Sequence, residues 1–76
     1  MNVRSLQEVL EELERARRMY PQFNSAHEGY ATMLEEFDEL WDEVKKSPAK
    51  RDPEAMRKEA VQVAAMALRF LEECVD

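Results

Sequence analysis

Apolar residues recur every three to four positions along most of the chain, the spacing that places side chains on one face of an α-helix. The pattern predicts three helices, over residues 5–20, 25–46 and 52–75. No stretch alternates between apolar and polar residues as a strand does, and no internal repeat is present. The sequence therefore predicts an all-α fold in which residues 1–76 form a single helical domain.

Each predicted helix has a start signal. Two of the starts have the spacing of a capping box, in which a hydroxyl and a carboxylate satisfy free amide groups of the first turn. These are Ser5 with Glu8, and Ser25 with Glu28. Asp52 can cap the third helix, with Pro53 as its first residue, and Pro21 stops the first helix. A polar linker at 47–51 separates the second helix from the third.

The third predicted helix is apolar on nearly every side over its stretch AVQVAAMALRFL. A helix of this kind is buried all round, and three short helices from one chain cannot easily enclose it. Small residues on it would allow another helix to approach closely. They are Ala60, Ala64, Ala65 and Ala67. We therefore expect an oligomeric helical bundle in which a second chain completes the core, as a homodimer or a dimer of dimers.

Composition and charge argue against some classes of binding partner and indicate the cellular compartment. The chain has 11 basic and 17 acidic residues, for a formal net charge of -6, which argues against nucleic acid and against an anionic membrane surface. Its charged N-terminal segment lacks the apolar core of a signal peptide, and no run is long enough to span a membrane. Cys74 is the one cysteine and cannot form an internal disulfide. We expect a cytoplasmic protein.

The second predicted helix carries an unusual row of acids. Six of the nine residues from Glu35 to Glu43 are acidic, and no lysine or arginine lies between Glu28 and Val44. Like charges three or four residues apart each cost a few tenths of a kcal/mol on a helix, so the row needs a reason. One interpretation is a solvated face that keeps the protein in solution. The other is a cation site.

Glu59 favours the cation site, because it lies on the otherwise apolar third helix, where an unpaired carboxylate is costly. If the second and third helices pack side by side, Glu59 can face the cluster of Glu35, Glu36 and Glu39 in the acidic row. Carboxylates that converge from two elements are typical of a magnesium site, because Mg²⁺ prefers oxygen ligands. The alternative is that Glu59 forms a salt bridge with Arg69, with Lys58 or with a neighbouring chain.

The acidic residues also resemble a known family. The run Glu35-Glu36-Phe37-Asp38-Glu39 matches the EExxE motif of the MazG-like all-α nucleoside triphosphate pyrophosphohydrolases, and Glu59 falls where their ExxD motif begins. The resemblance extends over about residues 23–74. The aspartate position of ExxD is occupied here by Gln62, which offers a neutral carbonyl oxygen in place of a charged ligand.

The resemblance implies a MazG-like fold and hydrolysis of a nucleoside triphosphate to the monophosphate and pyrophosphate. The implied cofactor is Mg²⁺, and the implied catalytic residue is Glu36, which would polarise the attacking water. Lys45 and Lys58 would contact the substrate phosphates, although basic residues here can equally serve the helix dipole and solubility. The implied metal ligands are Glu35, Glu36, Glu39, Glu59 and Gln62.

A different class of function stays open from the residues alone. The chain can be a non-catalytic helical oligomer, or a protein-interaction module whose metal site is degenerate at Gln62. Among the remaining residues, His27 either contacts a ligand or serves a surface or capping role. The spacing of Trp41 favours a core position over stacking on a base, and Phe23 fits a hydrophobic staple at the start of the second helix.

Overall fold

The computed structural model describes residues 2–76, and within that range it contains three α-helices and no strand. The elements are α1 (Val3–Met19), α2 (Ala26–Val44), a short 3₁₀ turn η1 (Pro48–Lys50), α3 (Pro53–Phe70) and a π-helical turn η2 (Leu71–Val75). The all-α prediction is confirmed, and each helix lies close to its predicted range. None of the helices in this range combines the length and the apolar character that a membrane crossing requires.

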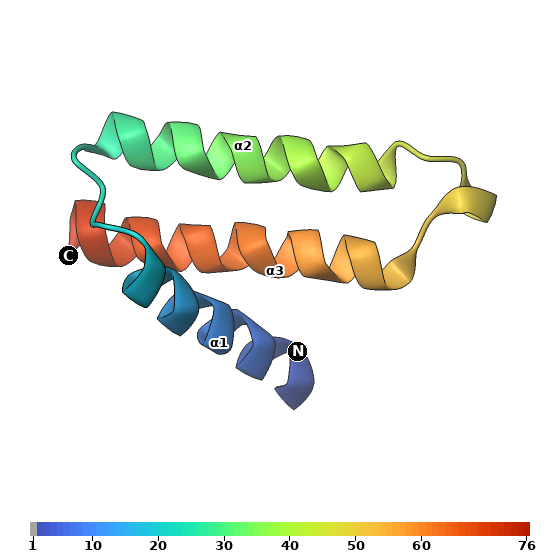
Figure 1. Cartoon of the computed structure of the whole chain (residues 1–76), viewed down its shortest axis with the longest axis horizontal. Helices are drawn as coiled ribbons and strands as arrows, with labels where there is room; N and C mark the ends of the chain where they lie inside the picture. The colour runs from blue at the N-terminus through green and yellow to red at the C-terminus, as the bar shows by residue number, and fades with distance from the viewer. Residues whose placement is uncertain (1) are drawn as a thin grey trace.

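The helix α3 lies at the centre of the molecule. Figure 1 shows α2 and α3 running antiparallel side by side, while α1 crosses α3 at an angle on the opposite side. The chain measures 41 × 27 × 21 Å along its principal axes. Because α1 and α2 both pack mainly on α3, the third helix supplies most of the shared interface, as its apolar sequence predicted.

The start of α1 differs from the prediction. The helix begins at Val3, and the Oδ1 of Asn2 accepts the capping hydrogen bond from the backbone N–H of Ser5 at 2.8 Å. The predicted capping box of Ser5 and Glu8 is therefore wrong, because asparagine caps as well as serine does and its use adds a turn to the helix. Both side chains instead accept hydrogen bonds from Arg57 of α3, at 3.0 Å to the Ser5 hydroxyl and 2.9 Å to the Glu8 carboxylate.

The other two predicted starts are confirmed. The hydroxyl of Ser25 accepts a hydrogen bond from the backbone N–H of Glu28 at 3.1 Å. The Glu28 carboxylate reaches back one residue further than expected and accepts from the backbone and side chain of Asn24, both at 3.0 Å. Asp52 caps α3, and Pro53 is its first residue. Local sequence thus determines where α2 and α3 begin.

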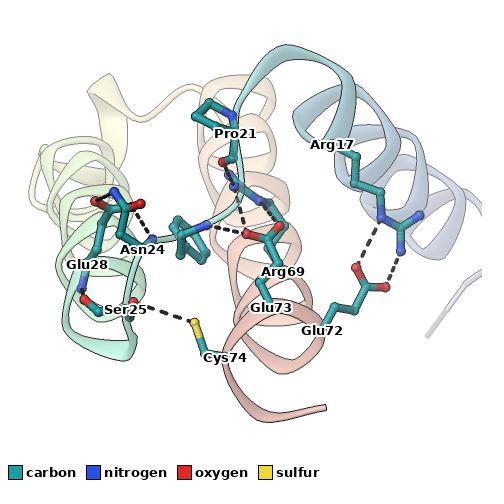
Figure 2. Close-up of polar contacts among 10 residues, drawn as sticks. Arg17, Pro21, Asn24, Ser25, Glu28, Arg69, Glu72, Glu73 and Cys74 are labelled. Atoms are coloured by element: carbon teal, nitrogen blue, oxygen red, sulfur yellow. Dashed lines mark hydrogen bonds and ion pairs between the residues drawn. The ribbon is translucent and has the colours of Figure 1, made fainter.

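The connection between α1 and α2 is clamped to the C-terminal end of α3 (Figure 2). Arg69, which is 2% exposed, donates to Glu73 at 3.0 Å and to the carbonyl oxygen of Pro21 at 3.1 Å. Its guanidinium lies 4.2 Å from the centre of the Phe23 ring, and the Phe23 N–H donates to Glu73 at 2.7 Å. Burial opposes ionisation of Glu73, but the bonds from Arg69 and Phe23 outweigh it and lower the pKa of this carboxyl.

Two further contacts hold the same corner. Arg17 of α1 pairs with Glu72 in η2, and the Cys74 thiol lies 3.8 Å from the carbonyl oxygen of Ser25. Cys74 is half-buried. This clamp was not predicted from the sequence, although the i, i+4 spacing of Arg69 and Glu73 was a signal for their pair.

The face of α2 that packs on α3 is not its most apolar one. The predicted apolar stripe is largely open to solvent, with Tyr30 64%, Phe37 49% and Trp41 59% exposed. The core position predicted for Trp41 is therefore wrong for the single chain. Gly29 supplies the reason, because a Cβ at this position would lie 2.9 Å from Phe70, so the close approach of α3 is on the Gly29 side of α2.

The buried core of the single chain is small. Leu13 and Ala16 of α1 and Ala65 and Met66 of α3 are the buried apolar residues in the part of the chain that the structure describes. Every residue from 61 to 70 on α3 is buried or half-buried, which confirms in part that this helix is covered on all sides. The contact face of α2 includes polar residues, and this brings acidic side chains against α3.

Candidate metal centre

Carboxylates from α2 and α3 converge between the two helices. Glu36 and Glu39 lie one helical turn apart on α2, and each can offer an oxygen within 4.8 Å of an oxygen of Glu59 on α3. Glu36 and Glu59 are half-buried and Glu39 is exposed. The predicted convergence of acids from two helices is confirmed for these three residues. We call Glu36, Glu39 and Glu59 the carboxylate cluster.

Glu36 has the most perturbed environment of the carboxylate cluster. Burial, followed by the negative charges of Glu39, Glu59 and Glu12, raises the pKa of Glu36 to about 7. Its Oε2 is buried and has no hydrogen-bond partner among the described residues. A buried carboxylate oxygen without a partner loses its hydration and gains nothing in return, so it is a place where a cation or a proton is favoured.

Glu59 is perturbed in the same direction. Burial and the charge of Glu39 raise its pKa, while the nearby Lys58 opposes the shift and Glu43 adds to it. The alternative that Glu59 pairs with Arg69 does not hold, because Arg69 is engaged by Glu73 and Pro21 at the far end of α3. The charges around Glu59 are thus mainly negative, and a cation would stabilise its ionised form.

The donor set fits a hard divalent cation. Three carboxylates on two rigid helices supply oxygen ligands only, the type that Mg²⁺ prefers, and the partly open position of Glu39 leaves room for water or phosphate oxygens to complete an octahedron. The unpartnered Oε2 of Glu36 adds an oxygen that lacks a hydrogen bond. No histidine or cysteine belongs to the carboxylate cluster, which makes zinc a poor match.

The remaining residues of the predicted site lie around the carboxylate cluster. Glu35 is exposed on α2 and is not one of the three converging carboxylates. Gln62 is half-buried on α3 and lines a cavity together with Glu36. Lys45 forms an ion pair with Asp42 at 3.0 Å, beyond the last turn of α2. Lys58 lines a second cavity together with Arg57.

Two cavities border this region, and Glu12, Arg15 and Gln62 line both of them. The first has a volume of about 330 Å³ and includes Glu36 in its wall. The second has a volume of about 380 Å³, and Arg57 and Lys58 are among its basic lining residues. The basic residues near the acids thus come from α1 and α3, and the contribution of α1 was not identified from the sequence.

Three residues considered in the sequence as possible ligand contacts lie in different parts of the structure. They are His27, Phe23 and Trp41. His27 is exposed in the first turn of α2, and it does not line either of the two cavities described above. Phe23 is half-buried against Gly29 and Arg69 and also lines the first cavity. It lies against the first turns of α2 as predicted, but Gly29 has no side chain to complete a hydrophobic staple. Trp41 lies on the exposed face of α2.

The chain was compared with known protein families, with curated proteins and with solved structures, and no match was found in any of the three. The MazG-like resemblance therefore depends only on the two motifs and the sequence that flanks them. The carboxylate cluster supplies the geometry from which a function can be argued.

Proposed function

We propose that this chain is a magnesium-dependent, MazG-like nucleoside triphosphate pyrophosphohydrolase. The observation that supports this proposal best is the convergence of Glu36, Glu39 and Glu59, with one buried Glu36 oxygen left unpartnered. Such a group of acids repels itself and a bare triphosphate alike, so a divalent cation has to accompany the substrate. Magnesium bound to these oxygens would neutralise phosphate charge and orient the phosphoanhydride for cleavage.

The residues of the chain have separable roles in this proposal. Glu39 and Glu59 would hold the cation, and the exposed Glu35 stays a predicted ligand on the border of the carboxylate cluster. Gln62, also predicted as a ligand, is half-buried in the wall of the first cavity, where it is available to the substrate. Glu36 accepts the proton of the attacking water at Oε2, because this buried oxygen has no hydrogen-bond partner among the described residues. Water adds to phosphorus, the α–β phosphoanhydride breaks, and pyrophosphate leaves.

Basic residues are proposed to contact the phosphates from the second cavity. Lys58 precedes Glu59 on α3, and Arg57 lies beside it in the same wall. Arg57 also donates to Glu8 at 2.9 Å, so its guanidinium is held in place by α1. Lys45 is less well placed, because it pairs with Asp42. We therefore assign phosphate binding to Lys58 first.

A second copy of the chain is proposed to cover the exposed face of α2. Tyr30, Leu34, Phe37 and Trp41 follow one another at helical spacing, and each is about half exposed or more. Contiguous large apolar side chains of this kind are uncommon on a monomer and are typical of an interface. The buried core of one chain is small, so a homodimer or a dimer of dimers would supply the missing burial.

A nucleotide panel tests the activity. Each triphosphate is incubated with the protein, with and without Mg²⁺, and the products are separated. The proposal expects monophosphate and pyrophosphate in the presence of magnesium only. Diphosphate and orthophosphate would place the cleavage at the terminal phosphate instead, and no turnover of any nucleotide would contradict the proposal.

The exposed apolar face also favours a second candidate, a non-catalytic module for oligomerisation or protein interaction. In that case the neutral Gln62 marks a degenerate metal site, and the acids serve only solubility. Metal dependence separates the two candidates. A protein that oligomerises identically with and without Mg²⁺, and that hydrolyses no nucleotide, belongs to the second class.

A further inference from the structure

The first cavity is built by all three helices and by the connection between α1 and α2. Its volume of about 330 Å³ lies within the usual range of small-molecule sites. Glu12 and Arg15 bring α1 into the wall, Thr32 and Glu36 bring α2, and Met66 brings α3. A ligand in this cavity would therefore contact a helix that lies outside the 23–74 segment of the family resemblance.

Glu36 connects this cavity with the carboxylate cluster, because it belongs to both. If the phosphates of a ligand lie at Glu36, Glu39 and Glu59, the remaining part of the ligand molecule therefore lies next to the cavity. The nucleoside half is the part of a nucleoside triphosphate that extends away from the phosphates. The geometry thus gives the cavity a specific occupant if the proposed function holds.

Both guanidinium groups of the cavity wall are already paired, and the unpartnered carboxylate of Glu36 belongs to the carboxylate cluster. Arg15 donates twice to Glu12, at 2.9 and 2.6 Å, and Arg69 donates to Glu73. Ion pairs that satisfy one another leave little demand for a charged ligand. The other wall groups include the rings of Tyr20 and Phe23 and the neutral polar side chains of Thr32 and Gln62. Such a wall suits an uncharged planar heterocycle.

We propose that this cavity binds the nucleoside half of the substrate and that Gln62 hydrogen-bonds the edge of the base, an inference that rests on the proposed function. The amide of Gln62 has an acceptor oxygen beside a donor nitrogen, the pattern that pairs with adjacent donors and acceptors on a nucleobase. The glutamine that replaces an acid in the second motif then sets base preference. Tyr20, which is 51% exposed, lies in the same wall and stacks on the base.

Uncharged nucleosides without magnesium test the cavity separately from catalysis. The full chain is titrated with adenosine, guanosine, cytidine and uridine, and its amide resonances are followed by NMR. We expect shifts in the side-chain NH₂ of Gln62 and in the backbone of Thr32, with different affinities for different bases. Gln62→Met keeps the length and helix preference of the side chain without the amide. It should weaken the preferred nucleoside about tenfold, the value of one good hydrogen bond, and reduce the differences between bases.

A matched variant controls for general effects. Gln7 is exposed on α1 and lines neither of the two cavities, so Gln7→Met should bind every nucleoside as the wild type does. The proposal is overturned if the wild type binds no nucleoside at millimolar concentration, if the shifts lie elsewhere, or if Gln62→Met keeps the wild-type affinities. Far-UV circular dichroism confirms that each variant is folded.

Gln62→Asp distinguishes base recognition from metal ligation at this position. If Gln62 contacts the base, the aspartate variant should bind Mg²⁺ as the wild type does and change its order of nucleoside affinities. Stronger Mg²⁺ binding with unchanged nucleoside binding would overturn the proposal and make residue 62 a metal ligand. Failure of the proposed function has its own signature, since nucleosides would then bind at Gln62 while no triphosphate is hydrolysed.

Discussion

The carboxylates of Glu36 on α2 and Glu59 on α3 come within 4.8 Å of each other, together with that of Glu39. Both side chains are half-buried, and burial is the first cause of the raised pKa of each. The pair thus places negative charge where the fold can least accommodate it without a cation or a proton.

The stability of the metal-free protein should fall as the pH rises through neutrality. The pKa of Glu36 is raised from 4.5 to about 7 on folding, so the folded state binds the proton more tightly than the unfolded chain does. The resulting stability is fully present below about pH 4.5 and is lost as the pH passes 7. Melting temperatures in EDTA from pH 5 to 8.5 measure the effect.

The variant Glu36→Gln identifies the group responsible for this pH dependence. It should remove most of the slope between pH 5 and 8, because the amide does not titrate, and Glu59, whose pKa is also raised, should account for the rest. The pKa values of Glu8 and Glu73 are lowered, so their contributions to stability are lost only at acid pH and do not interfere. A wild-type profile that rises through pH 7 would contradict the assignment.

Magnesium should stabilise the folded protein. At a metal concentration of about 100 times the dissociation constant, linkage gives roughly 2.7 kcal/mol in the free energy of unfolding. Thermal or urea unfolding with MgCl₂ is compared with NaCl at equal ionic strength, because screening alone also relieves repulsion among the acids. Equal stability in both salts, with and without a non-hydrolysable nucleotide, would favour a solvated acidic face.

Glu59→Gln should abolish magnesium-dependent hydrolysis while the fold survives. The substitution keeps the shape of the side chain but removes a charge that helps to hold the cation. The transition state then loses the electrostatic stabilisation that the cation supplies, so we expect kcat to fall roughly 10²-fold or more. The metal-free variant should be at least as stable as the wild type, since the pKa of Glu59 is raised.

The matched control for this substitution is Asp38→Asn. Asp38 is an exposed acid on α2 and is not part of the carboxylate cluster, so its neutralisation should leave turnover close to the wild-type rate. If both variants lose activity equally, the total negative charge of α2 and α3 is responsible, and a role for Glu59 as a ligand is ruled out.

The protein should sediment at no less than twice its 9.0 kDa chain mass at micromolar concentration. Trp41 lies 59% exposed on the apolar face of α2, and Trp41→Glu should shift the population to monomer, because central aromatic residues carry 2 kcal/mol or more of many interfaces, about a 30-fold weakening. Val3 is 70% exposed on α1, and Val3→Glu serves as the control. A wild-type monomer that stays cooperatively folded on dilution would exclude the dimer.

Gly29→Ala should destabilise the protein although alanine favours helices. A Cβ there would lie 2.9 Å from Phe70 and 3.1 Å from the Sγ of Cys74, and overpacking of this kind costs about 1–3 kcal/mol, against roughly 1 kcal/mol gained in helix propensity. Gly29→Val should cost more. Urea unfolding measures both, and an alanine variant more stable than the wild type would show that α2 and α3 are not held this close.

Much of the fold was determined by local sequence. The three helices follow from apolar spacing, and the caps Ser25 and Asp52 act through hydrogen bonds to amide groups within the next three residues, so local sequence was enough to locate them. Ser5 shows the limit of such reasoning. Asn2 and Ser5 are both good caps, and the longer helix prevailed once Ser5 had a second partner in Arg57.

Tertiary structure decided which face of α2 meets α3. Periodicity correctly separates an apolar side from an acidic side, but it does not say which side a neighbouring helix will reach. The approach at Gly29 and the clamp of Arg69 and Glu73 fix the rotation of α2, and they leave Trp41 outside. Both depend on contacts between residues far apart in the chain, which no local pattern contains.

The candidate site was likewise determined partly by local sequence and partly by tertiary packing. The sequence by itself determined that acids recur on α2 and that Glu59 interrupts an apolar helix, because residue type and helical spacing are local properties. Only the packing of α2 on α3 selected Glu36 and Glu39 as the partners of Glu59, and only the crossing of α1 enclosed the cavity beside Gln62. Convergence in space depends on helix rotation and crossing angle, and these are set by side-chain packing between helices.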